Sequence, residues 1–435
     1  MTRWRAAALV LSSVLILPAH AQSRLAARMP GAGFGLGMGA GPGLGLGLGL
    51  GLDHVPADFG HRGPGMLDAL DQDTLRRLTG QRRAAIRRLL RTHGDLVEAD
   101  PDGDPVVRHE IVATFPTSAA RARATALGFT VIRDHPMADL GLDVVALAVP
   151  PHWSLRRSLR TLRAAVPEGT YDYDQIYFTS GTPAGAVAAR GASANARAVR
   201  RLPKLGLIDT GIDASAPVFR RSIVHTRGFG AATRPAAHGT AVASLLVRGA
   251  PADLYVADVY CGMPTGGSAE SLIAALAWLA RHRVPVINVS LVGPKNRLLA
   301  QVIAALLAKG YVIVAAVGND GPAAPPLYPA AYPQVVGVTG VDARGRVLLE
   351  AERGPQVTFA ALGAGVPVAT VGGGTSVARG TSFAAPTVAA LFGALMDAPN
   401  PRAAATARAA LIARAVDLGA RGWDPIYGYG LLGAR

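Results

Sequence analysis

Leu205–Asp213 reads LGLIDTGID, a run of apolar residues and glycine that ends at an acidic residue, Asp209. Such nearly continuous apolar runs are typical of strands buried on both faces of a parallel sheet. Four further runs follow: DLYVADVY (253–260), VPVINVSL (284–291), YVIVAAVGN (311–319) and VVGVTGV (335–341). Alanine-rich segments of helical character separate them and are expected to begin near His238, Ser268 and Arg297, with a further helix at Thr381. This alternation predicts a doubly wound α/β fold with a mostly parallel sheet flanked by helices.

Polar residues at the ends of these strands are candidates for chemistry, because doubly wound sheets bind ligands at the carboxyl ends of their strands. Asp209 directly follows a strand, whereas His238 in AAHGTAVASLL and Ser382 in GTSFAAP lie at loop-to-helix junctions. Acid, base and nucleophile in this order can form a catalytic triad if the fold brings them together. Two alternatives stay open: Thr381 and Ser382 only cap a helix, or His225 in FRRSIVHTRGF is the base.

Residues 204–435 resemble the subtilisin-like serine peptidases through motifs in the family's order. These are IDTGID around Asp209, HGTAVA around His238, VINVSLVGP at Val286–Pro294, AAVGNDG around Asn319, GTSFAAP around Ser382 and YGYGLLGA at Tyr427–Ala434. The resemblance implies a serine endopeptidase that hydrolyses peptide bonds through an acyl-enzyme, with Asp209, His238 and Ser382 as the triad. Asn319 and the backbone N–H of Ser382 would stabilise the oxyanion. The alternatives are a catalytically silent member that keeps the fold as a binding or chaperone-like module, and a secreted cationic polymer-binding protein.

The resemblance also implies that protein or peptide substrates bind as an added strand, because an extended peptide has unpaired backbone groups that a sheet edge can satisfy. The expected edges are Ser290-Leu291-Val292-Gly293 on one side and Gly266-Gly267 on the other. Val292 departs from the family pattern, which more often has glycine at this position. The bulk of valine predicts a narrowed pocket and a preference for smaller substrate side chains.

Several nearby residues allow a purely structural interpretation as well as a functional one. Asp320 either faces the pocket entrance and favours basic side chains or is a solvated loop acid. Asp213 is expected to be a turn residue rather than a second catalytic acid. Tyr328-Pro329 resembles a family turn with a cis bond, and the isomer stays open. Ala241 takes a place where many relatives have a second histidine.

The chain is expected to have five parts. Residues 1–21 have arginines, an apolar run and a small-residue cleavage site, as in a secretory signal peptide. Residues 22–65 are a Gly/Leu-rich low-complexity linker. Residues 66–178 are a helical segment followed by strands and helices in the order βαββαβ, which indicates a small ferredoxin-like α+β module. Residues 179–204 are predicted to be an exposed linker, and residues 205–435 the catalytic domain.

Secreted members of the resembled family commonly carry a propeptide of βαββαβ order that assists folding, occupies the cleft with its C-terminal tail and is cut by the enzyme itself. Val106–Phe178 matches that architecture and position. The resemblance therefore implies an autoprocessed precursor whose own propeptide is an intramolecular inhibitor. An unrelated accessory domain is the alternative.

Composition narrows the partners and the compartment. The formal net charge is +15, but the arginines are scattered and aromatic residues make up only 6% of the chain, so a nucleic-acid partner is not expected. The apolar run near the N-terminus is too short to span a bilayer, so stable membrane insertion is not expected. With the signal-like N-terminus, this favours a secreted or periplasmic protein, which we expect to be a monomer. Cys261 is the single cysteine, which excludes an intrachain disulfide and favours a small buried residue over a reactive thiol. Acidic residues are few in the catalytic region, so no cofactor is expected; calcium is possible but not indicated.

Overall fold

The computed structural model describes residues 80–186 and 202–433, with the backbone alone for residues 182–186. All of these residues belong to one compact unit, Arg62–Arg435. The predicted signal peptide, the Gly/Leu-rich segment and residues 187–201 lie outside the described residues.

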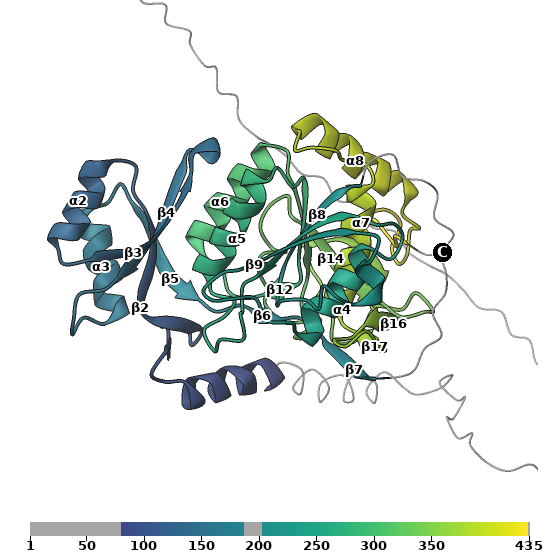
Figure 1. Ribbon diagram of the computed structural model, residues 1–435, viewed down its shortest axis with the longest axis horizontal. Coiled ribbons are helices and arrows are strands. Elements are labelled where there is room, and N and C mark those ends of the chain that lie inside the picture. The colour runs from purple at the N-terminus through teal and green to yellow at the C-terminus, as the bar shows by residue number, and fades with distance from the viewer. Residues whose placement is uncertain (1–79, 187–201, 434–435) are drawn as a thin grey trace, which may run out of the picture. The chain divides into compact units, whose positions relative to one another are not determined.

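A seven-stranded sheet forms the centre of the larger domain (Figure 1). Its spatial order is β15-β14-β13-β11-β8-β10-β9, and every neighbouring pair is parallel. The strands are β8 (Lys204–Asp209), β9 (Ile223–Gly228), β10 (Asp253–Asp258), β11 (Val286–Val289), β13 (Val312–Ala316), β14 (Val336–Val341) and β15 (Val357–Leu362). The predicted parallel α/β sheet is confirmed. The edge strands β9 and β15 were not predicted, and β9 gives no apolar signal because most of its side chains are exposed.

Helices cover both faces of this sheet. Helices α4 (Ala237–Leu246), α7 (Ala385–Gly393) and α8 (Pro401–Arg414) pack on one face, and α5 (Ala269–Arg281) and α6 (Arg297–Ala308) on the other. The side chains of β8 alternate between the two cores, since Leu207 packs with α4 and α7 while Ile208 packs with α5 and α6. Burial on both faces explains why the strands read as continuous apolar runs.

Side-chain caps set the starts of α5 and α6. The hydroxyl of Ser268 accepts a hydrogen bond from the Ser271 N–H, and the Asn296 side chain accepts one from the Leu299 N–H. The helix predicted to begin at Thr381 is different. Thr381–Phe383 is a short 3-10 turn (η3), and α7 begins only at Ala385, without a side-chain cap. The N-cap interpretation of Thr381 is therefore wrong.

Two small sheets lie beside the central one. Strand β12 (Leu291–Val292) pairs with β6 (Phe178–Thr179), and β17 (Thr375–Arg379) pairs on its two sides with β16 (Ala364–Ala369) and β7 (Thr182–Ala186). All these pairs are antiparallel. A further 3-10 turn, η2, covers Pro217–Phe219.

These pairings correct the predicted linker. Residues 179–186 are not an exposed connection, because Thr179 is in β6 and Thr182–Ala186 form β7. The other end also differs, since Lys204 is the first residue of β8. A Gly-, Ala- and Ser-rich composition indicates a loop only where no neighbouring edge supplies partners for the backbone.

The smaller domain is an antiparallel sheet with two helices. Along the chain it contains β1 (Val97–Ala99), β2 (Pro105–Thr114), α2 (Ser118–Ala126), β3 (Thr130–Met137), η1 (Ala138–Leu140), β4 (Leu142–Ala148), α3 (Leu155–Ala165) and β5 (Thr170–Gln175). The four long strands lie in the order β5-β2-β4-β3, with β1 on the first residues of β2. This confirms the predicted small βαββαβ module.

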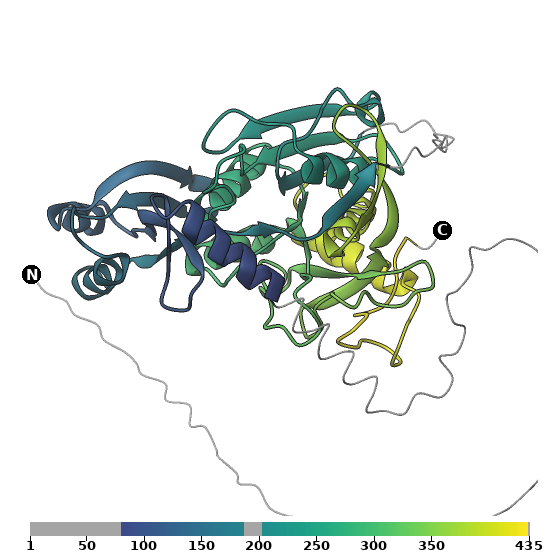
Figure 2. The same ribbon diagram turned by 90° about the horizontal axis from the view of Figure 1, so that it is seen from below.

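The sheet of this module is covered on both faces. Ile111 and Leu147 point to α2 and α3, whereas Val112 and Val144 belong to the core that contains α5 and α6. Figure 1 shows α5 and α6 between this sheet and the central sheet, and Figure 2 shows the module side by side with the larger domain. The two domains thus share apolar packing.

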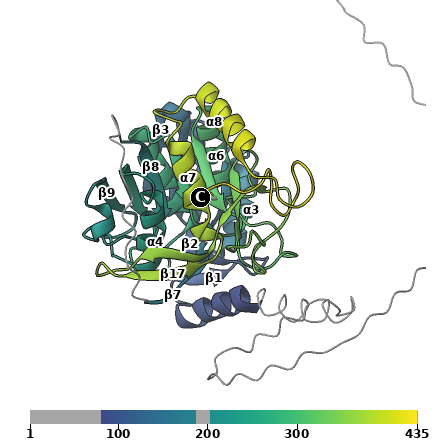
Figure 3. The same ribbon diagram turned by 90° about the vertical axis from the view of Figure 1, so that its right-hand side faces the viewer.

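Residues 80–92 form a helix before the module. Figures 1 and 3 place it on the side of the molecule where β7 runs. No helix among the described residues is both long enough and apolar enough to cross a membrane.

Candidate active site

Asp209 and His238 are in direct contact. Asp209 is the last residue of β8, and His238 is the second residue of α4. His238 Nδ1 lies 2.8 Å from Asp209 Oδ1, and the carboxylate is fully buried. Nε2 of His238 has no hydrogen-bond partner within the described chain. This arrangement fixes one ring nitrogen on the acid and leaves the other available as a base.

Thr210 aligns this pair, although the sequence did not single it out. Its N–H donates to Asp209 Oδ1 at 2.7 Å, and its hydroxyl accepts from the Gly239 N–H at 2.8 Å. The end of β8 is thereby joined to the first turn of α4. A Cβ at Gly239 would lie 2.2 Å from the Thr210 carbonyl oxygen, so only glycine permits this approach.

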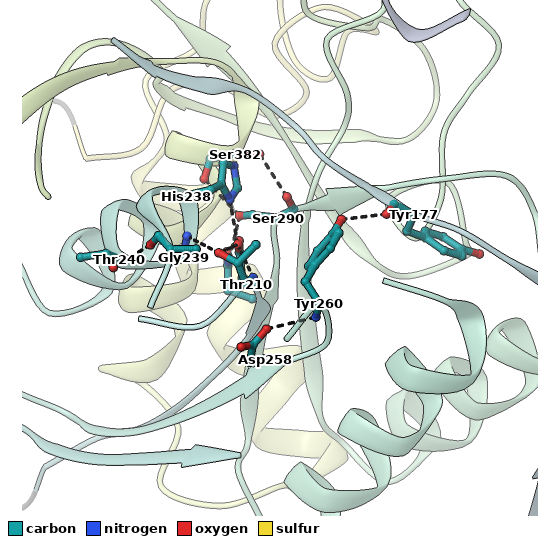
Figure 4. A network of polar contacts seen from close by, with 12 residues as sticks. Tyr177, Thr210, His238, Gly239, Thr240, Asp258, Tyr260, Ser290 and Ser382 are labelled. Carbon is teal, nitrogen blue, oxygen red and sulfur yellow. Dashed lines mark hydrogen bonds and ion pairs between the residues drawn. The ribbon is translucent and has the colours of Figure 1, made fainter. Parts of the chain in front are cut away.

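Ser382 lies beside His238 and is fully buried (Figure 4). Its hydroxyl donates to the Ser290 carbonyl at 3.2 Å, and the Ser290 hydroxyl donates back to the Ser382 carbonyl at 3.1 Å. The structure therefore brings the three predicted residues together but gives the Ser382 hydroxyl a backbone partner in place of His238.

Asn319 follows β13 and lies at the same place. Its side-chain oxygen accepts from the Thr381 N–H at 3.1 Å, and its Nδ2 donates to the hydroxyl of Ser180 at 2.7 Å. Gly380 makes room for these contacts, since a Cβ there would lie 3.2 Å from Asn319 Nδ2 and 2.9 Å from the Gly181 Cα, and its φ is +135°. The Asn319 amide, which was expected to stabilise an oxyanion, thus donates to Ser180, a residue of the same chain that lies in the cleft.

That segment, Ile176–Ala186, runs as an added strand past Ser382. Tyr177 N–H donates to the Gly267 carbonyl at 2.8 Å, and Phe178 and Thr179 pair with Val292 and Leu291. Beyond Ser180, β7 pairs with β17. Both predicted edges therefore bind an extended strand, but two of their glycines do not take part. Gly266 closes a turn onto Met263, and the N–H and carbonyl of Gly293 are both paired with Tyr328.

Tyr260 and Asp258 hold one of these edges and were not predicted. The Tyr260 hydroxyl donates to the Tyr177 carbonyl at 2.7 Å. Asp258, at the end of β10, accepts from the N–H groups of Tyr260 and Cys261 and so shapes the loop (Figure 4). Burial, together with the charge of Asp209, raises the pKa of Tyr260 well above its usual range, so this phenol remains a donor. The signal in the sequence was the polar end of DLYVADVY.

Acidic residues lie behind and beside Asn319. Burial raises the pKa of Asp320, an effect that the nearby Arg82 partly offsets. Burial and the charge of Asp320 raise the pKa of Glu352 to about 9. Glu352 accepts from the Leu327 N–H and lies against Gly318, where a Cβ would be 2.3 Å from its carboxyl oxygen. Val292, Asp320 and residues 178–181 line one cavity of about 580 Å³, so Asp320 is at the cleft and not in a solvated loop.

The remaining candidates have structural surroundings. His225 lies on the edge strand β9 against Asp253 and stacks on Tyr255. Asp213 accepts from the N–H and hydroxyl of Ser215, as a turn residue does. Cys261 and Ala241 are buried, and the Tyr328-Pro329 bond is cis. Among residues 80–186 and 202–433, no group of three or more His, Cys, Asp or Glu side chains is gathered around a possible metal position.

The fold and this geometry define a subtilisin-like serine peptidase domain. The Subtilase family model matches residues 201–430, so the chain belongs to the subtilase family. The predicted resemblance is confirmed.

Individual relatives share parts of the chain. It is 30% identical over 167 residues to the minor extracellular protease Epr of Bacillus subtilis, covering 38% of this chain but only 26% of that protein. It is 28% identical to subtilisin of Bacillus pumilus over 254 residues, covering 53% of this chain and 89% of the relative. Subtilisin E of Bacillus subtilis is 32% identical over 210 residues, which cover 43% of this chain and 53% of that protein.

A solved structure extends the similarity in fold. Fervidolysin from Fervidobacterium pennivorans, a keratinolytic enzyme related to subtilisin, superposes with a TM-score of 0.63 at 18% identity. The superposition covers 77% of this chain and 61% of fervidolysin. That share is larger than residues 201–430 make up, so the similarity in fold reaches beyond the peptidase domain.

Proposed function

We propose that this chain is the precursor of a secreted serine endopeptidase in which Asp209, His238 and Ser382 form the catalytic triad. The observation that carries the proposal is the 2.8 Å contact between His238 and Asp209 beside a buried Ser382, at the point where an extended strand of the chain passes Asn319. Protein or peptide substrates would occupy the same edges, Ser290–Val292 and Gly267, in the extended form.

The proposed reaction needs only groups that this site contains. His238 Nε2 takes the proton from Ser382 Oγ, which attacks the scissile carbonyl carbon and forms a tetrahedral intermediate. Asn319 Nδ2 and the Ser382 N–H donate to its oxyanion. His238 then protonates the leaving amine, the acyl-enzyme remains on Ser382, and a water activated by the same imidazole hydrolyses it. Asp209 holds the imidazole tautomer and stabilises the cation.

The described arrangement is a resting one within this scheme. Ser382 Oγ donates to the Ser290 carbonyl, and His238 Nε2 is unpaired in the described chain. Rotation of the Ser382 side chain away from Ser290 would bring its hydroxyl to Nε2, and the attack would follow from that rotamer.

The N-terminal module would be a propeptide. Its last strand, β5, continues into the segment that fills the cleft, and this continuity supports a role as an intramolecular inhibitor. Residues 1–21 would direct export to the periplasm or the medium, and the processed enzyme would be a monomer without a nucleic-acid partner, stable membrane insertion or an essential cofactor.

A fluorophosphonate probe tests the function. Processed wild-type protein should be labelled at Ser382, whereas Ser382→Ala should stay uncut and take no label, with its thermal unfolding showing that it is folded. Folded, processed protein that takes no label would instead support the catalytically silent binding or chaperone-like module. An unchanged unfolding temperature in excess chelator is expected, and a large drop would reveal a structural metal such as calcium.

A further inference from the structure

We infer that the peptide bond between Ser180 and Gly181 is the bond at which the precursor is cut. This inference rests on the proposed function and adds the position of the bond, the residue on each side of it and the resulting mature N-terminus. It follows from the register in which the segment Ile176–Ala186 crosses the site.

The residues before the bond form a continuous ladder with the two cleft edges. Ile176 forms a bridge with Ser268, Tyr177 donates to the Gly267 carbonyl, and the Tyr177 carbonyl accepts from Tyr260. Phe178 is opposite Val292 and Thr179 is opposite Leu291. Because an antiparallel ladder fixes register residue by residue, this pairing places Ser180 opposite Ser290, the residue whose carbonyl accepts from Ser382 Oγ.

Ser180 meets both parts of the catalytic machinery. Its N–H donates to the Ser290 carbonyl at 3.3 Å, and its side chain lies 2.7 Å from Asn319 Nδ2 and 3.2 Å from the Thr381 hydroxyl. Ser180 is only 3% exposed. In the described state its hydroxyl, and not its carbonyl, accepts from Asn319. The Ser180 hydroxyl therefore occupies the donor that the carbonyl oxygen needs during reaction.

The residues after the bond are paired as well. Thr182 is opposite Arg379 and Pro183 is opposite Ala378, so the chain is held on the far side of Ser382 too. Gly181 connects the two ladders with φ of +120°, a conformation open to glycine and strained for other residues. A Cβ on Gly380, two residues before Ser382, would lie 2.9 Å from the Gly181 Cα, and a Cβ on Gly181 would lie 3.0 Å from the Phe383 ring, so the two glycines allow a close approach of the chains.

The step is ordinary hydrolysis. Ser382 Oγ attacks the Ser180 carbonyl carbon, the bond to the Gly181 nitrogen breaks, and His238 passes the Ser382 proton to that nitrogen. Water then releases Ser180 as a free carboxylate. A serine in this position also fits the small residue that Val292 was predicted to favour.

The first test is the identity of the first product. Wild-type precursor is sampled over time, and its fragments are analysed by N-terminal sequencing and intact mass. The expected first mature N-terminus is Gly181-Thr182-Pro183, paired with a leader fragment that ends at Ser180. A first cut at another position, for example after an arginine in residues 187–201, overturns the inference.

Variants at the bond give a second test. Proline cannot adopt the φ of Gly181, so Gly181→Pro should slow conversion about 10²-fold or more. Ser180→Ala keeps the fit and frees Asn319 Nδ2, so it should be cut at the same bond at least as fast as wild type. Thermal unfolding of uncut protein shows whether each variant is folded. Cleavage of folded Gly181→Pro between these residues at the wild-type rate would contradict the inference.

Comparison with Ser382→Ala distinguishes failure of the cleavage-site inference from failure of the proposed peptidase function. If cutting depends on Ser382 but occurs elsewhere, the Ser180–Gly181 inference fails and the peptidase remains. If neither the wild type nor Ser382→Ala is cut and folded wild type takes no fluorophosphonate, the proposed function fails.

Discussion

Arg82 Nε lies 3.6 Å from Asp320 Oδ2, which joins the helix of residues 80–92 to the loop that carries Asn319. The same guanidinium lies 5.6 Å from the centre of the Phe178 ring. Both partners of the ion pair are largely shielded, with side-chain exposures of 14% and 20%. A helix that precedes the N-terminal module therefore contacts both the cleft and the strand within it.

Arg82→Ala should weaken retention of the leader after cleavage. A partly shielded ion pair and a cation–π contact together contribute roughly 1 kcal/mol, so the lag between cutting and the appearance of peptidase activity should shorten about fivefold. Arg83→Ala is the matched control, because that neighbouring arginine is exposed. Equal lags for the two variants would show that the Arg82 contacts do not hold the leader.

Asn319→Ala should lower kcat by about 10²–10³ with little change in KM, as is typical when one oxyanion donor is removed. Peptide hydrolysis by processed enzyme measures this. Asn319 also accepts from the Thr381 N–H, so Asn319→Asp keeps that acceptor while removing the donor and should lose similar activity. Asp320→Asn is the control, and a comparable loss there would assign the effect to the loop instead of the amide.

Asp174→Asn should change how the stability of the uncut precursor depends on pH. Asp174 is buried between the domains and accepts from the Glu270 N–H, and it is faced by Glu110, Arg133 and His135 as well as Glu270. Burial and the charge of Glu270 raise the pKa of Asp174 well above its usual value. A raised pKa means that the stabilising contribution is complete at low pH and is lost as the pH rises. Asp174→Asn should therefore increase the free energy of unfolding at pH 7 and change it much less near pH 4.

Glu270→Gln should have the opposite pH dependence. Burial opposes ionisation of Glu270, but its hydrogen bond with His135 and the charge of Arg133 outweigh this and lower its pKa. A lowered pKa contributes stability at neutral pH that is lost in acid. Urea unfolding of both variants in the Ser382→Ala background, where the chain should stay uncut, measures the two profiles. If the free energy of unfolding of the two variants changed with pH in the same direction, the opposite roles assigned to Asp174 and Glu270 would be wrong.

Val292→Gly should widen the cleft beside the strand that carries the substrate. Val292 is 4% exposed and lines the same cavity as Ser180, the residue before the proposed bond. Removing its side chain should raise kcat/KM for peptides with phenylalanine before the cut bond, relative to peptides with alanine, by about tenfold. A wild-type enzyme that already prefers large aromatic residues would contradict the predicted narrow pocket.

The sequence alone was sufficient to select the candidate site residues that lie at the ends of strands or at the starts of helices. Asp209 and Asn319 stand out because an apolar run stops at or just before a polar residue, and His238 stands out because it lies at the start of an apolar helical segment. These local patterns can be seen without the fold. The parallel sheet is equally local in origin, since burial on both faces requires apolar runs. The same logic missed β9, whose exposed side chains give no such signal.

Only the tertiary structure could decide which partners these residues have. Ser180 lies in a segment of small residues that reads as a linker, yet the edges at Ser290–Val292 and Arg379 hold this segment in an extended form beside Ser382. Thr381 reads as a helix cap, but packing against Gly318 and Asn319 gives it a different role. Composition determines the local conformational preference of a segment. Its backbone hydrogen bonds to a sheet edge far away in the sequence depend on which edge the fold places beside it. For this reason the candidate catalytic residues could be selected from the sequence, and the bond proposed to be their first substrate could not.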